Sequence, residues 1–369
     1  MTRRQLSRHE REVRRQRIAL IAVAAALAIA LLVPIYGYWR ETFAKGGEAI
    51  AVVQGQPIST ELYARFLGFQ EQVVERQAKR LSDATATATD DATKQSLQLQ
   101  QQNLQQRAQS LSDDALAYLV ERPFVLAEAA KRGLTASPQE IDRALQQEMS
   151  SYPNYGLRYQ SLSDVPDDKL VSLDKAKSDL KALLGSSQFL TEDQVRDLVL
   201  TQRVLRGKIL AALSEGVPTS GEQVQARHIL VDTEEKAKAA RDRIAKGEGF
   251  AAVAKEVSTD TGSKDKGGDL GWFTRDQMIK EFADAAFSLP VNEVSQPVKT
   301  TYGYHLIQTL EKSDNRPFEK AYVDQLKGSK FADWISSQET ADGAVEKLDS
   351  QDKLSWADKY ISDRLSAAK

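Results

Sequence analysis

Residues 224–231 read VQARHILV, and this stretch decides the fold of the second half of the chain. It is rich in β-branched and other apolar residues and follows the turn-forming sequence GVPTSG at 216–221, so it predicts a strand that opens a new domain. Helices, a polar loop and further strands are predicted downstream at 234–246, 250–257, 258–268, 273–289, 294–298 and 305–309. This order predicts an α+β domain with a small antiparallel sheet.

The chain on both sides of this domain is mostly helical. A short strand at 49–53 (AIAVV) and a turn at 54–57 lead into a helix that Ser59 caps. Two long helical stretches follow, with a solvated hinge between them at 83–94, and the loop 150–165 precedes further helices. The helical stretches are 61–80, 95–130, 169–215 and 318–326, followed by an aromatic-containing segment to 365.

The N-terminus predicts a membrane anchor. Residues 1–17 hold seven arginines against two glutamates, and 18–35 has no charged residue. As a helix, that apolar run would be about 27 Å long, close to the hydrocarbon thickness of a bilayer. With the aromatic residues up to 39, it predicts one transmembrane helix at 18–38, with the basic tail in the cytoplasm and the rest of the chain outside. A cleaved signal peptide is the alternative, although no convincing cleavage site follows.

Composition narrows the chemistry. The 369 residues, 41% of them hydrophobic and 28% charged, suggest two or three domains. The absence of cysteine excludes disulfides, thiolate metal sites and a cysteine nucleophile. The three histidines are His9, His228 and His305, so imidazole chemistry has few candidates. The basic tail adjoins an apolar span and the remaining chain is acidic, which disfavours nucleic acid as a partner.

Five spaced sequence blocks lie in the second half of the chain, at 226–231, 267–273, Met278 with Phe282, 287–289, and 302–307. In this order they resemble the parvulin (PpiC-type) family of peptidyl-prolyl cis/trans isomerases. The resemblance covers 221–312. More weakly, 49–62 and 130–135 resemble the helical module of SurA- and PrsA-like extracytoplasmic folding factors.

The resemblance implies an active site. His228, Asp260 and His305 are implied as its catalytic group, with Asp260 in the loop where the family has Cys or Asp. The residues implied to contact the substrate are Leu270, Met278, Phe282, Thr300 and Tyr302. The first three match the family's cup for the proline ring, and Met278 and Phe282 are four residues apart, so on one helix they would face the same way.

The roles of the two histidines stay open at this point. Two close imidazoles do not both carry a charge readily, so one is expected to be neutral and to orient the site or to take part in proton transfer. A metal site at His228, His305 and Asp260 lacks supporting spacing, and Ser258 or Ser263 lacks the turn motif of a nucleophile. No metal or cofactor is therefore expected.

Together these observations predict a membrane-anchored foldase. The resemblance implies a helical chaperone-like domain at 48–216, completed by helices at 318–365, with the isomerase inserted at 221–312. The predicted function is proline isomerisation in unfolded exported polypeptides at the outer face of a bacterial membrane. The alternative is a non-catalytic chaperone whose parvulin-like domain only binds. Acidic residues at 232–235 occupy the place of the basic cluster in phosphate-selective relatives, so an unphosphorylated residue before proline is expected.

Overall fold

The computed structural model describes residues 36–37, 40, 44–150, 170–185 and 189–367. The chain forms two compact units, one from Met1–Ser214 with Gly328–Lys369 and one from Glu215–Lys327. In this described part of the chain, no helix is both long and apolar enough to cross a membrane. Apart from residues 36 and 37, the predicted span 18–38 lies outside the described residues.

The first unit begins with a small sheet. Strand β1 (Ala49–Val53) pairs with β2 (Gln56–Ser59) and with β7 (Val345–Lys347), all antiparallel. The strand at 49–53 is confirmed, but the turn predicted at 54–57 is shorter: Gln54 and Gly55 make it alone, both at positive φ, and β2 begins at once. A two-residue turn of this kind joins adjacent strands directly, which makes a hairpin.

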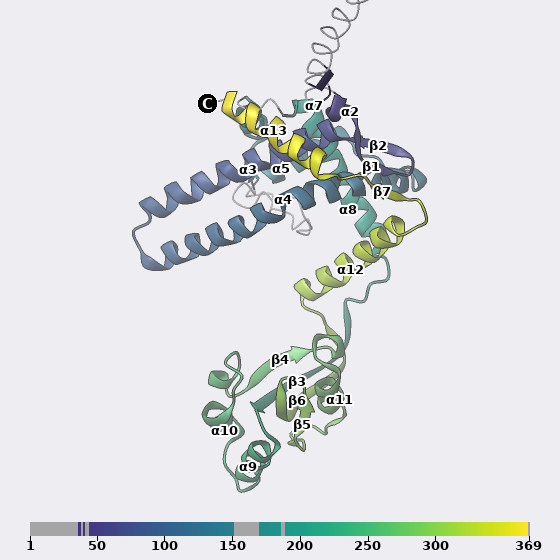
Figure 1. The fold of residues 1–369 in the computed structure, drawn as a ribbon. Helices are drawn as coiled ribbons and strands as arrows, with labels where there is room; N and C mark the ends of the chain where they lie inside the picture. Colours follow the sequence, from purple (N-terminus) through teal and green to yellow (C-terminus); the bar gives the residue numbers. More distant parts are fainter. Residues whose placement is uncertain (1–35, 38–39, 41–43, 151–169, 186–188, 368–369) are drawn as a thin grey trace, which may run out of the picture. The chain divides into compact units, whose positions relative to one another are not determined.

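The helices of this unit bury one large apolar core. After α2 (Lys45–Gly47), the long helices α3 (Thr60–Thr87) and α4 (Asp91–Lys131) lie side by side as a hairpin in Figure 1. The remaining helices are α5 (Pro138–Ser150), α6 (Leu173–Leu184), α7 (Glu192–Val195), π-helical η3 (Arg196–Thr201), α8 (Gln202–Leu213), most of α12 (Lys320–Glu339) and α13 (Gln351–Ala367). Their buried faces share a core that includes Phe66, Leu145 and Phe331.

Two helix predictions are wrong in extent. The hinge predicted at 83–94 shrinks to three residues, because alanine continues α3 and the Asp90 carboxylate caps α4 by accepting the Thr93 N–H at 2.7 Å. The segments predicted at 318–326 and after 331 are one helix, α12, which continues through Gly328. Each error places a break at a stretch that is poor in large apolar residues but that remains helical at least in part.

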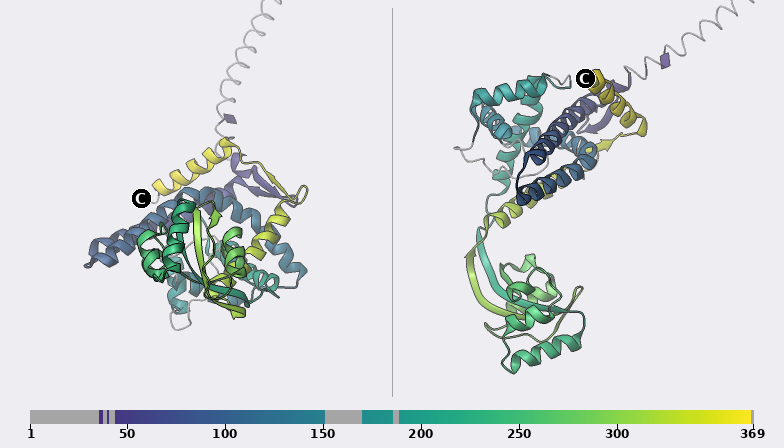
Figure 2. Two further views of the ribbon diagram at one scale, coloured as in Figure 1. Left: turned by 90° about the horizontal axis from the view of Figure 1, so that it is seen from below. Right: turned by 90° about the vertical axis from the view of Figure 1, so that its left-hand side faces the viewer.

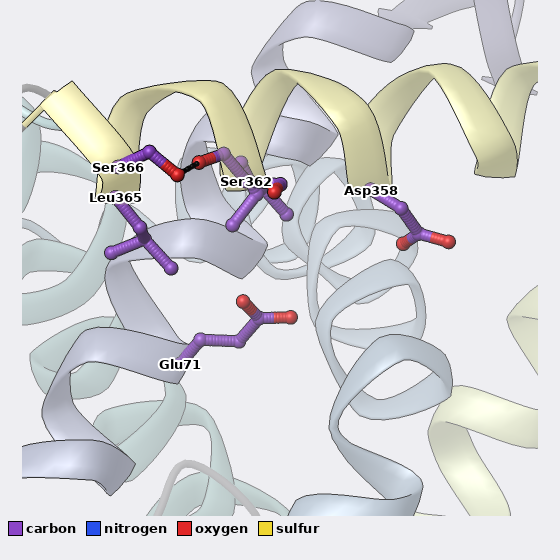
Figure 3. Close-up of a pocket in the computed structure, with 6 residues that line it drawn as sticks. Glu71, Asp358, Ser362, Leu365 and Ser366 are labelled. Atoms are coloured by element: carbon purple, nitrogen blue, oxygen red, sulfur yellow. Dashed lines mark hydrogen bonds between the residues drawn. The ribbon is translucent and has the colours of Figure 1, made fainter.

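A shallow groove separates α13 from α3. Figure 3 shows Glu71 of α3 projecting towards α13, where Asp358, Ser362, Leu365 and Ser366 line the opposite side. Partial burial, and then the charges of Asp358 and Glu75, raise the pKa of the Glu71 carboxyl group. The groove therefore brings together two acidic side chains, Glu71 of α3 and Asp358 of α13.

The second unit is a four-stranded antiparallel sheet with helices on both faces. Its elements in chain order are β3 (Ser220–Val231), α9 (Glu234–Ala245), α10 (Phe250–Val257), η4 (Lys264–Lys266), β4 (Asp269–Phe273), η5 (Arg275–Gln277), α11 (Lys280–Ser288), β5 (Val298–Thr300) and β6 (Gly303–Pro317). The strand order is β4-β3-β6-β5. Helices α9 and α10 cover one face and α11 covers the other (Figure 1). The predicted α+β class is confirmed.

Three strand predictions in this unit need correction. The predicted order omits β4. The strand predicted at 294–298 reduces to a single bridge between Val294 and Gln308, and β5 starts at Val298. The polar stretch 311–317, expected to lead out of the domain, continues β6 because its backbone pairs with β3 as far as Ser220 and Pro317. Figure 2 shows β3 and β6 as long neighbouring strands.

Candidate active site

Strand alternation places both histidines on the α11 face of the sheet. On β3, Ile229 and Val231 pack with α9 and α10, so His228, which directly precedes Ile229, points to the opposite face. On β6, Leu306 likewise packs on the α9 and α10 side, which turns its neighbour His305 towards α11. Both imidazoles are buried, with His228 6% and His305 5% exposed.

The two histidines form a direct hydrogen bond. The Nδ1 atoms of His228 and His305 are 3.1 Å apart, and the ring planes differ by 19°. In the sheet, His228 pairs with Ile307 and His305 pairs with Leu230, so the two imidazoles meet diagonally. The predicted closeness of the histidines is thus present on the central strand pair.

A loop carboxylate completes one end of this arrangement. Asp260 Oδ2 lies 2.8 Å from His228 Nε2, and the Ser263 hydroxyl bonds the same carboxylate oxygen. The Ser263 bond, followed by His228 and the Gly262 N–H, lowers the Asp260 pKa to about 2 against the opposing effect of burial. Asp260 is therefore an anion at neutral pH and accepts hydrogen bonds only.

A hydroxyl completes the other end. Thr300 Oγ1 lies 2.9 Å from His305 Nε2 and accepts the backbone N–H of Tyr302 at 3.1 Å. Burial, followed by the neighbouring His228, lowers the pKa of His305 to about 4. His305 is consequently neutral at pH 7. The side chains Thr300, His305, His228 and Asp260 form one continuous hydrogen-bonded chain, which we call the site chain.

The apolar side chains predicted as the proline cup lie against this chain. Phe282 on α11 is 3% exposed, and its ring meets both imidazoles edge-on, at 5.7 Å from His228 and 5.3 Å from His305. Leu270 and Met278 are half-buried and pack on the same cluster. The expectation that Met278 and Phe282 share a helix is wrong, because Met278 has an extended backbone and α11 begins at Lys280.

Tyr302 is the predicted site residue least engaged with the others. Its side chain is 71% exposed, and it joins the site chain only through the backbone N–H that reaches Thr300. The adjacent Gly303 has φ of 134°, and a Cβ there would lie 2.5 Å from the Val231 carbonyl oxygen. The turn can therefore follow β3 closely only with glycine at 303.

Glycine and serine fasten the loop that carries Asp260. The Gly268 carbonyl accepts the His228 N–H at 2.9 Å, and a Cβ at Gly268 would lie 2.1 Å from the His228 carbonyl oxygen. Ser258 Oγ accepts the N–H groups of Leu230 and Asp260. These bonds hold the loop along the edge of β3, which brings the carboxylate to the imidazole.

Sequence reasoning missed Ser263 as a member of the site. The sequence offers Ser263 only as a candidate nucleophile, yet its buried hydroxyl contacts both Asp260 and His228. The one usable signal was its spacing three residues after Asp260. Among the described residues, no group of three or more His, Cys, Asp or Glu side chains is placed to hold a metal ion.

Comparison with known proteins identifies the family of this domain. Residues 212–313 match the family model of the PPIC-type PPIase domain. The chain is accordingly a peptidyl-prolyl cis/trans isomerase of the parvulin type, as the sequence blocks predicted.

The relatives place the whole chain in a family. Foldase protein PrsA of Caldanaerobacter subterraneus subsp. tengcongensis is 32% identical over 317 residues, which is 86% of this chain and 89% of the relative. Foldase protein PrsA of a Geobacillus species is 36% identical over 211 residues, or 52% of this chain and 74% of the relative. The chain belongs to the PrsA foldase family. A crystal structure of PrsA from Bacillus cereus is 25% identical, covers 66% of this chain and 90% of that chain, and has a TM-score of 0.34.

Proposed function

We propose that X-Pro bonds of unfolded exported polypeptides isomerise over the α11 face of the sheet, beside the site chain. The carrying observation is that Phe282 contacts both buried imidazoles edge-on, which joins an apolar cup to a fixed row of polar groups. Rotation of an X-Pro amide breaks no covalent bond but crosses a barrier of about 18–20 kcal/mol. A site that binds the twisted amide better than the planar one lowers that barrier.

Each group in the site has a distinct proposed role. Leu270, Met278 and Phe282 hold the proline ring in a dry cup, where a planar amide that loses its hydration is at a disadvantage. The ionised Asp260 anchors His228, and His228 in turn orients the neutral His305. The imidazoles thus act as fixed polar groups next to the rotating amide, and no proton needs to leave the substrate.

The segment after β3 supports a preference for an unphosphorylated residue before proline. Asp232 pairs with Lys236 at 2.7 Å, and Glu234 pairs with Lys238 at 2.6 Å. Each of these two lysines therefore has a carboxylate beside it, and residues 232–238 hold three carboxylates against two lysines. A phosphate would meet acidic groups here, which disfavours its binding.

We also propose where the protein acts and how its parts share the work. The apolar run 18–38 anchors the chain, the basic tail 1–17 stays in the cytoplasm, and the rest lies outside. The helical domain 48–216 with 318–365 holds clients, and 221–312 isomerises them. In the described part of the helical unit, the large exposed apolar side chains are Tyr36 and Leu99. The proposal that this unit holds clients is therefore argued from the sequence pattern.

Two experiments test these proposals. Alkaline washing of membranes should leave the chain in the pellet, and protease treatment of intact cells should cleave the bulk of the chain from outside. A chain that is released by the wash or protected from the protease would contradict the anchor.

Deletion of the isomerase domain should preserve suppression of aggregation of a thermally unfolding client, followed by light scattering. A folded deletion variant that no longer slows aggregation would place client holding in the isomerase domain.

A further inference from the structure

Ser263 is fixed at the junction between Asp260 and His228. It lies just before η4, and its side chain is buried. Its Oγ bonds Asp260 Oδ2 and lies 3.1 Å from His228 Nε2. Its carbonyl oxygen accepts the N–H groups of Gly268 and Lys266, both at 2.9 Å. The hydroxyl is therefore held in place by the turn and not by its own side-chain contacts alone.

Counting hydrogens decides the direction of these bonds. A serine hydroxyl carries one hydrogen, and the best acceptor within reach is the ionised carboxylate of Asp260. With that hydrogen committed, Ser263 Oγ can only accept from His228 Nε2. Asp260 Oδ2, 2.8 Å from the same nitrogen, can also only accept. Two acceptors converge on Nε2, so Nε2 must carry a hydrogen.

The consequence propagates along the site chain. When His228 is the neutral imidazole, a hydrogen on Nε2 leaves Nδ1 bare, and Nδ1 then accepts the hydrogen on Nδ1 of His305 across the 3.1 Å contact. The neutral His305 then has a bare Nε2, which accepts the Thr300 hydroxyl at 2.9 Å, a shorter distance than the 3.4 Å from that hydroxyl to the Gly303 carbonyl oxygen. Every donor then faces an acceptor, and all hydrogens in the site chain point from Thr300 towards Asp260.

We propose that Ser263 is a positioning residue that fixes His228 as the Nε2–H tautomer and thereby sets the direction of all hydrogen bonds from Thr300 to Asp260. It acts on the isomerisation through the two imidazoles and does not touch the substrate. The catalytic meaning of this inference rests on the proposed function of the site. The tautomer itself is a property of the free protein and can be measured without substrate.

The experiment uses the full chain labelled with [15N]histidine. Because the protein has only three histidines, the ring nitrogens give a small set of signals that single substitutions at His228 and His305 assign. In the wild type at neutral pH, His228 should show a protonated Nε2 and a bare Nδ1. In Ser263→Ala, Nε2 loses one acceptor and Asp260 loses the hydroxyl that holds its carboxylate against Nε2, so the other tautomer of His228 should become populated and the two nitrogen shifts should move towards each other. The kcat should fall roughly tenfold with a KM changed less than twofold.

Three variants separate this role from ordinary packing. Ser263→Thr keeps the hydroxyl and should restore the wild-type nitrogen shifts, whereas Ser263→Cys keeps the volume but is a weak donor and should resemble Ser263→Ala. Ser295→Ala is the matched control, since Ser295 is equally buried and bonds the Ile307 N–H at 2.9 Å without reaching the histidines. That control should lower stability but leave the ring shifts unchanged.

The outcomes are distinct. Unchanged nitrogen shifts in both Ser263→Ala and Ser263→Cys would overturn the proposal, as would a Ser263→Thr variant that matches Ser263→Ala. If Ser263→Ala does not fold, Ser263→Cys and Ser263→Thr decide between the same results. A tautomer change without loss of isomerisation would support the fixing of the tautomer and contradict the catalytic role of the site chain.

Discussion

The Nδ1 atoms of His228 and His305 lie 3.1 Å apart inside the isomerase unit, and only one hydrogen fits between them. Burial, and then the neighbouring His228, lower the pKa of His305, so the pair does not readily take up a proton there. Two imidazoles that share a hydrogen and lie against Phe282 form a rigid polar wall beside an apolar cup. Rigidity of this kind is what discrimination between a planar and a twisted amide requires.

The low pKa of His305 predicts an acid-sensitive isomerase unit. The pKa of His305 is about 4 in the folded state, whereas that of an ordinary histidine is near 6.5. Between these pH values the unfolded chain binds more protons than the folded chain does. The free energy of unfolding therefore falls as the pH drops through this window. The expected loss is roughly 3 kcal/mol at most. Denaturant unfolding between about pH 7 and pH 4 measures it, and His305→Gln should flatten the profile. Equal slopes in both proteins would refute this assignment.

Substitutions in the proline cup should differ from one another. Phe282 is 3% exposed at the centre of its cluster, so Phe282→Ala should destabilise the unit by about 3–5 kcal/mol and is a poor probe of binding. Met278 is half-buried at the edge, so Met278→Ala should lower kcat/KM about tenfold while the unit remains folded, and Met278→Leu should retain activity. The exposed Val291→Ala is the control. Activity of Met278→Ala equal to wild type would make Met278 an ordinary packing residue.

Two glycines offer a matched test of the loop attachment. Gly268 and Gly271 both have positive φ, but a Cβ at Gly268 would meet the His228 carbonyl oxygen at 2.1 Å, whereas the space around Gly271 is open. Gly271→Ala should cost about 1–2 kcal/mol from backbone strain alone. Gly268→Ala should cost clearly more and should also reduce isomerisation, because the loop that carries Asp260 must move. Similar unfolding free energies for the two variants would contradict this account.

In the helical unit, Glu71→Gln should be stabilising. Burial, and then the charges of Asp358 and Glu75, raise the pKa of the Glu71 carboxyl group in the folded state. The contribution of this group to the free energy of unfolding is therefore complete at pH values below the ordinary glutamate pKa, and it is lost as the pH rises through the raised pKa of the folded state. At neutral pH the substitution should add on the order of 0.5–1 kcal/mol, a gain that vanishes in acid. The exposed Glu339→Gln serves as control. A gain that persists unchanged in acid would exclude the electrostatic explanation.

Sequence patterns predict the helices and strands that are stabilised by the packing of their apolar side chains. β3 was predictable because its apolar residues pack on both faces of the sheet, and α10 because its apolar spacing is regular. The extension of β6 could not be predicted in this way. Residues 311–317 are largely polar and exposed, and they are held by backbone pairing with β3. Strand β7 has three residues without a pattern and exists only because β1 offers an edge.

The same distinction applies within the site. The resemblance to the parvulin family implies that His228 and His305 share a face of neighbouring strands, and it also implies Asp260 and Phe282 as site residues. The contact of Ser263 with both Asp260 and His228 depends on how an irregular loop folds back on β3, and no local pattern encodes that path. The position of Met278 was mistaken for the same reason, because η5 and the extended residue after it interrupt the expected helix.

The most direct test of the central claim measures proline isomerisation by the intact chain. Exchange NMR of an unphosphorylated X-Pro peptide should show faster cis/trans exchange with the wild type, and the double variant His228→Ala with Asp260→Ala should lose at least tenfold of that acceleration while near-UV circular dichroism shows a folded protein. A folded double variant that accelerates exchange as well as the wild type does would contradict the claim that the site chain supports the reaction.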